Sequence, residues 1–81
     1  MNAKSQPRKP DTQGQVIHDP SQQKFFLVSE GKEAFLLYIR RSGNLIDFTH
    51  TYVPPQLRGA GIAARLAEAG LMYAADAGCR I

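Results

Sequence analysis

The stretch Gln56-Leu57-Arg58-Gly59-Ala60-Gly61 is the most informative part of this sequence. It follows a run of apolar residues that ends at Pro54-Pro55, and it precedes an alanine-rich segment. Glycine lets a backbone turn tightly and approach a ligand closely. The first amides of a helix have no partner within that helix and lie at the positive end of its dipole, so such a loop can bind phosphate. Alternatively, the two glycines only shape a tight entry into the helix.

We expect a helix over residues 62–77, directly after this loop. Apolar and small residues recur there at helical spacing and would face a core: Ile62, Leu66, Ala69, Gly70, Tyr73 and Ala77. The many alanines favour a helix, and their small size would let it lie close to a sheet. Gly78 suits the position just after a helix, and Cys79-Arg80-Ile81 resembles the start of another strand.

Four strands are expected before the loop, over residues 15–18, 24–29, 33–40 and 45–53. The turns between them are short, so neighbouring strands run antiparallel. The third strand is apolar on both faces, which predicts a central strand covered on both sides. In the fourth, strict alternation places one set of residues on a common face: Ile46, Phe48, His50 and Tyr52. Pro54-Pro55 then ends the strand, because proline cannot donate to a sheet.

The positive charge of the chain is concentrated near its start. Its 81 residues carry ten Lys or Arg against seven Asp or Glu, a net charge of +3, but from Asp11 onward seven basic residues face seven acidic ones. Residues 1–15 have almost no apolar content, so we expect a disordered basic and polar tail there and one domain over residues 16–81. No nucleic-acid partner is expected; the alternative is a tail that touches phosphate.

Composition also bounds the location and the cofactors. No apolar run approaches the ~20 residues of a membrane helix, so no membrane association is expected. The single cysteine cannot form an internal disulfide or a Cys-rich zinc site, which favours a reducing, cytoplasmic location and no metal. We expect a monomer or a weak homodimer.

Three phosphate-binding motifs compete for the loop. A P-loop needs Gly-Lys-Ser/Thr at the helix start, whereas Gly61 is followed by Ile62-Ala63. The run from Gly59 to Ala64 fits the G-x-G-x-x-A form of a dinucleotide fingerprint, but that motif belongs directly behind a strand of a parallel sheet. Here five residues intervene and the preceding strands are antiparallel. The pattern Q-x-x-G-x-G is met in full by Gln56, Gly59 and Gly61.

With this loop the chain resembles the GNAT superfamily of N-acetyltransferases, whose pyrophosphate-binding loop is Q/R-x-x-G-x-G/A at the start of a long helix. It is most similar to the small single-domain GNAT-like proteins of the YjdJ type. In those, a hydrophobic strand ending in His-Thr and Val precedes the loop and an alanine-rich helix, as Thr49-His50-Thr51-Tyr52-Val53 does here. The resemblance covers residues 16–81 and implies an α+β fold: an antiparallel meander, a long helix and the start of a fifth strand.

The resemblance implies acetyl-CoA as co-substrate and a primary amine as acceptor. Loop amides would hold the pyrophosphate, and the pantetheine arm would meet the main chain at the end of the fourth strand. The residues that carry over are Tyr52, Val53, Gln56, Leu57, Arg58, Gly59, Ala60, Gly61 and Ile62. His50 is the candidate base, since its unperturbed pKa of ~6.5 suits proton transfer. The alternative is a structural histidine packed with Phe48 and Tyr52.

One departure from the family concerns the fifth strand, of which this sequence holds three residues. We therefore expect either a fragment of a longer protein or a partner that supplies the missing strand. The expected function is acetyl-CoA-dependent N-acetyl transfer. The alternative is a non-catalytic module with the same fold that binds acyl-CoA or a protein, because no convincing acid–base pair is present.

Overall fold

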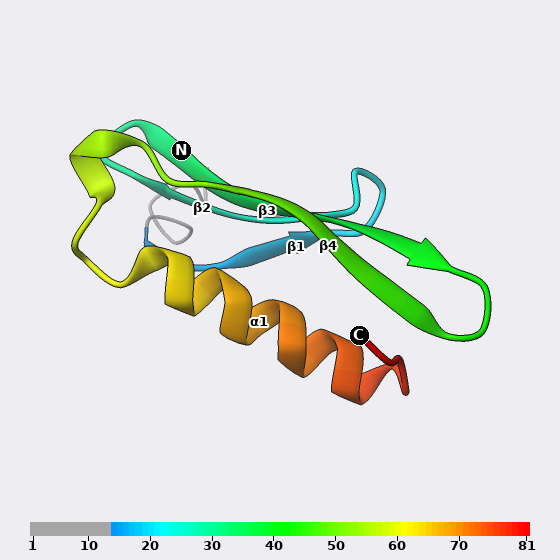
Figure 1. Ribbon diagram of the computed structural model, residues 1–81. Coiled ribbons are helices and arrows are strands. Elements are labelled where there is room, and N and C mark those ends of the chain that lie inside the picture. Colours follow the sequence, from blue (N-terminus) through cyan, green and yellow to red (C-terminus); the bar gives the residue numbers. More distant parts are fainter. Residues whose placement is uncertain (1–13) are drawn as a thin grey trace, which may run out of the picture.

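The computed structural model describes residues 14–81, which form one antiparallel sheet with one helix on a single face (Figure 1). The sheet order is β1-β2-β3-β4, with β1 at Ile17–Asp19, β2 at Lys24–Ser29, β3 at Lys32–Arg41 and β4 at Leu45–Tyr52. A short 3-10 turn, η3 (Pro55–Leu57), and the helix α1 (Ile62–Asp76) follow. The meander and long helix expected from the sequence are confirmed. The predicted tail lies outside the described residues, except for Gly14 and Gln15.

The turn between β2 and β3 shows why the meander is tight. Glu30 and Gly31 have φ values of 53° and 73°, so both central residues of this two-residue turn are left-handed. That backbone matches the twist of the flanking strands. The two strands therefore pair without slippage, from Ser29 opposite Lys32 to Lys24 opposite Leu37.

The core lies between α1 and one face of the sheet. Alternate residues of β3, Ala34, Leu36 and Tyr38, are buried there. The helix contributes a stripe at helical spacing: Ile62, Leu66, Gly70 and Ala74. The expectation that both faces of β3 are covered is wrong for the described residues. Phe35 and Leu37 are only half-buried and Ile39 is 39% exposed on the other face, because α1 is the sole described element that packs on the sheet.

A bulge in β4 also corrects the strict alternation that the sequence predicts. Leu37 lies opposite His50 but Tyr38 lies opposite Phe48, so Thr49 is an extra residue without a partner. An extra residue reverses which side the later side chains face. Phe48 therefore packs towards α1, whereas His50 and Tyr52 share the open face with Phe35.

Of the fifth strand expected at residues 79–81, the structure shows an isolated bridge next to β4. Arg80 forms a parallel bridge with Leu45. The Ile46 amide donates to the Arg80 carbonyl at 2.7 Å, and the Arg80 amide donates to the Asn44 carbonyl at 2.6 Å. The contact lies at the start of β4, far from its Tyr52 end, so the outer edge of β4 is paired by described residues only at its beginning.

Residues 14–81 hold neither a membrane-spanning helix nor a cluster of metal-ligating side chains. None of the helices in this part of the chain has the length and hydropathy to span a bilayer. No three side chains of the metal-ligating types gather there into a cluster.

Candidate functional site

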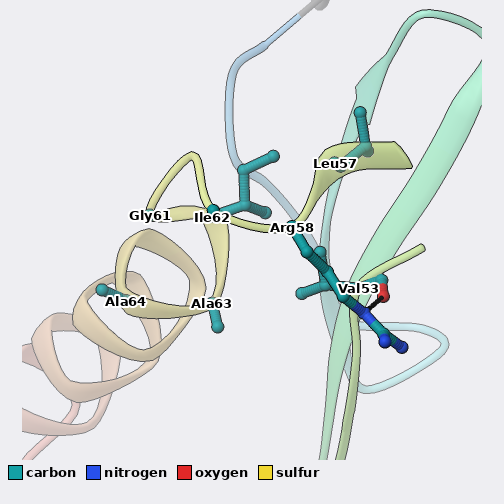
Figure 2. Close-up of a pocket in the computed structure, with 8 residues that line it drawn as sticks. Val53, Leu57, Arg58, Gly61, Ile62, Ala63 and Ala64 are labelled. Carbon is teal, nitrogen blue, oxygen red and sulfur yellow. Dashed lines mark hydrogen bonds between the residues drawn. The ribbon is translucent and has the colours of Figure 1, made fainter. Parts of the chain in front are cut away.

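A pocket of about 240 Å³ lies between the end of β4 and the start of α1 (Figure 2). It is lined by Val53, Leu57, Arg58, Gly59, Gly61, Ile62, Ala63 and Ala64. These residues come from the end of β4, from η3, from the glycine loop that follows η3 and from the first turn of the helix. The strand-to-helix connection that the sequence singles out therefore forms a real concavity.

The connection is held in place at two points by the core. Pro54 and Leu57 are both buried, and Leu57 is only 4% exposed. The Leu57 amide donates to the Pro54 carbonyl at 2.9 Å, which closes the turn of η3. Ile62, at the first position of α1, is 6% exposed. The segment between Leu57 and Ile62 is therefore anchored in the core at both of its ends.

The start of α1 presents backbone amides without competition from acidic side chains. Gly61 caps the helix with a φ of 74°, and its first turn holds no acidic residue and no side-chain cap. The first bond within the helix runs from the Arg65 amide to the Gly61 carbonyl at 3.1 Å. The amides of Ile62, Ala63 and Ala64 precede that bond, so they belong to the unpaired group found at every helix start. An anion is favoured at such an end.

The two glycines leave room for a ligand. A Cβ built on Gly59 or on Gly61 meets no atom within 4 Å, so open space lies outside both residues. Both also have positive φ, 87° and 74°, a conformation that side chains disfavour. Open space beside free backbone amides is what a phosphate group needs, so this helix start is suited to an anion.

The structure brings six of the nine predicted cofactor residues to the pocket. Those six are Val53, Leu57, Arg58, Gly59, Gly61 and Ile62. Tyr52, Gln56 and Ala60 are exposed and do not line it. Sequence reasoning missed Ala63 and Ala64, although they follow Gly61 directly at the helix start, where free amides are expected.

His50 lies on the open face of the sheet and does not line the pocket. It is exposed, and its ring stacks near Phe35 with centroids 6.3 Å apart. The suggested packing of His50 with Phe48 is wrong, because the bulge at Thr49 separates these two residues onto opposite faces. Val53 is three positions after His50, about 10 Å along an extended strand.

A second polar cluster joins β1, β3 and α1 on the covered face. His18 Nε2 and the Tyr38 hydroxyl share a hydrogen bond of 2.6 Å, and the His18 ring lies 4.4 Å from the Tyr73 ring. Arg40 donates to the Tyr73 hydroxyl at 2.7 Å. Burial lowers the pKa of His18, with Asp19 opposing, and burial next to Tyr73 raises the pKa of Tyr38 to about 12. The sequence places Tyr73 on the core-facing stripe of the helix, but it gives no sign of these bonds.

Comparison with known proteins points to one family. A family model described as GCN5-related N-acetyl-transferase matches residues 24–81. Two curated relatives are the Protein NATD1 of Gallus gallus, 38% identical over 64 residues, and that of Mus musculus, 36% identical over 63 residues. The matches cover 76% and 75% of this chain but 58% and 57% of the relatives, so the chain spans a little over half their length.

Proposed function

The chain belongs to the GCN5-related N-acetyltransferase family, and on that premise we propose that it transfers an acetyl group from acetyl-CoA to a primary amine. The observation that carries the proposal is the pocket at the glycine loop, between the end of β4 and the start of α1. Its lining combines free backbone amides with apolar side chains. Coenzyme A has two parts that complement this lining. Its pyrophosphate accepts hydrogen bonds from amides, and its pantetheine arm has apolar segments that can pack on apolar side chains.

The helix start would hold the phosphate end of acetyl-CoA. The amides of Ile62 to Ala64 supply donors, and the dipole of α1 favours negative charge there. Gly59 and Gly61 keep that space free of Cβ atoms. Val53 and Leu57 give the pocket an apolar wall, against which the arm of the ligand would lie.

The thioester end would lie along the outer edge of β4. Of the described residues, only Arg80 pairs with that edge, and it does so next to Leu45. The edge near Tyr52 therefore lacks a strand partner among the described residues and is open to a ligand, whereas the Val53 carbonyl already accepts a hydrogen bond from Arg58 Nε. A backbone N–H donated to the thioester carbonyl would stabilise the negative charge that develops on its oxygen.

His50 is the proposed base for the acceptor. The acceptor arrives as an ammonium and must first lose a proton, which the neutral imidazole of His50 would take and pass to water. The amine nitrogen then attacks the thioester carbon. A carbon–nitrogen bond forms, the carbon–sulfur bond breaks, and the second amine proton leaves to the coenzyme A thiolate. The products are the acetamide and coenzyme A thiol.

Replacing Gly61 by Glu tests the binding half of this proposal. We expect acetyl-CoA to raise the melting temperature of the unmodified chain and to have no effect on Gly61→Glu, because the new side chain would fill and charge the phosphate space. Gly31→Glu is the matched control. Gly31 has the same conformation, with φ of 73° against 74°, and open space around it, but lies in the β2–β3 turn.

The control separates backbone strain from loss of the site. Both variants should melt lower than the unmodified chain without ligand, because a side chain at positive φ is strained. Only Gly31→Glu should keep the shift caused by acetyl-CoA. No shift for the unmodified chain at millimolar acetyl-CoA contradicts the proposal.

The position of His50 favours a second candidate function, a non-catalytic acyl-CoA-binding module. His50 is exposed on the face opposite α1 and lies outside the pocket. Thioester consumption with a panel of amines distinguishes the two functions. Binding of acetyl-CoA without turnover on any amine favours the module.

A further inference from the structure

The Arg58 side chain makes a specific hydrogen bond within the chain. A residue that served only as a positive charge would not need this bond. Arg58 Nε donates to the carbonyl of Val53 at 2.9 Å, and both residues line the pocket (Figure 2). Nε is the inner nitrogen of the guanidinium, next to the aliphatic stem. The bond therefore ties the start of the glycine loop to the residue that directly follows β4.

The local backbone explains why a side chain makes this bond. The two residues after Val53 are Pro54 and Pro55, neither of which has an N–H. The Gln56 amide makes no hydrogen bond to Val53, and the two amides after it are committed to η3, since Leu57 donates to Pro54 at 2.9 Å and Arg58 to Pro55 at 3.3 Å. The guanidinium thus provides the Val53 carbonyl with a donor that these backbone groups do not provide.

The bond has a mechanical consequence for the loop. Leu57 anchors the chain in the core, and Ile62 anchors it again at the first position of α1. The bond from Arg58 adds a link from the loop to the end of β4. Gly59, Ala60 and Gly61 are then the only residues between a fixed start and a fixed end.

We propose that Arg58 is a positioning residue, which sets the spacing between the phosphate end and the thioester end of the acetyl-CoA site. The inference rests on the proposed function, in which one ligand spans both ends. Such a ligand binds well only when the loop and the strand are held at one spacing. The role of Arg58 is therefore carried by its Nε bond and not by its charge, which is exposed and screened by salt.

Three substitutions separate the bond from the charge. In Arg58→Gln, the side-chain amide nitrogen is as many bonds from the backbone as Nε is, so the donor stays and the charge is lost. In Arg58→Lys, the charge stays but the nitrogen lies one bond farther out. Arg58→Met loses both. The side chain is exposed, so none of the three substitutions opens the core.

Two measurements on the full chain read out the variants. Calorimetry should show that Arg58→Gln binds acetyl-CoA like the unmodified chain, whereas Arg58→Lys and Arg58→Met bind about two- to tenfold more weakly, the range for one lost hydrogen bond. That loss should not change as salt is raised to about 0.2 M. Hydrogen exchange without ligand should be faster at the amides of residues 59–63 in the Lys and Met variants only.

The opposite order of variants overturns the proposal. If Arg58→Lys binds normally, and Arg58→Gln is as weak as Arg58→Met with a deficit that shrinks in salt, Arg58 acts as a phosphate-binding charge. Equal affinity of all three variants also overturns it. Absence of acetyl-CoA binding by the unmodified chain overturns the proposed function instead. The order of the exchange rates then still decides whether Arg58 holds the loop.

Discussion

Gly70 lets α1 lie close to the sheet. A Cβ at this position would come within 2.8 Å of Phe48 Cε1 and 3.1 Å of Leu36 Cδ2. In an exposed helix, a change from glycine to alanine stabilises by about 1 kcal/mol. Here we expect Gly70→Ala to destabilise by about 1–3 kcal/mol, the usual cost of overpacking a core, as measured by urea unfolding.

A double variant checks the cause of that effect. Phe48→Leu should remove part of the penalty of Gly70→Ala, because it takes away the ring that the new methyl group contacts. Additive effects of the two substitutions would contradict the steric explanation. A stabilised Gly70→Ala variant would contradict the close approach itself.

His50 is the proposed acceptor of the amine proton. Because its side chain is exposed, replacing it does not disturb the core. We expect His50→Gln to lower the rate of thioester consumption by at least about a hundredfold with an amine that the unmodified chain acetylates. The melting-temperature shift caused by acetyl-CoA should be unchanged, since His50 does not line the pocket. Normal turnover by His50→Gln would contradict this role. Water would then remove the proton, and the His50 ring would have a structural role.

The packing of β1 against α1 depends on a titratable side chain. His18 stacks on Phe25 at 4.3 Å and contacts Tyr38 and Tyr73, with Asp19 beside it and Arg40 bound to Tyr73. Burial lowers its pKa in the folded chain below the 6.5 of an unfolded one, despite the opposing carboxylate. The unfolded chain therefore binds this proton more readily than the folded chain does.

The sign of the pH effect follows from that difference. The free energy of unfolding should fall as the pH drops through 6.5 and should level off below the folded-state pKa of His18. Urea unfolding at about pH 7.5 and pH 5.5 measures the difference. His18→Phe should flatten it, whereas His50→Gln, which changes the other histidine, should leave it intact. An unchanged slope in His18→Phe would assign the effect to other groups.

The strand β4 has two sides with different roles because of one extra residue. Before Thr49, its side chains at Ile46 and Phe48 serve the core. After Thr49, those at His50 and Tyr52 face away from α1. The bulge therefore allows one short strand to contribute both to the core and to the open face, while Val53, directly after the strand, lines the pocket.

At the scale of the whole molecule, the described residues 14–81 form a sheet covered on one side. On the open face the register aligns Ile17, Phe26, Phe35 and Tyr52 in one row across all four strands. The pocket lies at the end of α1 that is near Val53, and the bridge from Arg80 lies at the opposite end of β4. The candidate site and the bridge from Arg80 are thus separated along β4.

Local signals in the sequence were sufficient for the order of elements and for the loop. Alternating residues, Glu30-Gly31 and Pro54-Pro55 specify strands and their ends, and the spacing of Ile62, Leu66 and Gly70 specifies a helix, because each depends on neighbours a few residues away. The motif of Gln56, Gly59 and Gly61 pointed to the correct family for the same reason.

Contacts between distant segments could not be predicted in this way. The bulge at Thr49 exists only in the register of β3 against β4, and it moves His50 away from Phe48. The bond between His18 and Tyr38 and the contact between Gly70 and Phe48 join residues 20 or more positions apart. Even the bond from Arg58 to Val53 requires the chain to reverse through η3. Periodicity in the sequence predicts which side of a helix or strand a residue occupies. Which atoms come into contact on that side depends on strand register and on packing between distant segments, which only the tertiary structure determines.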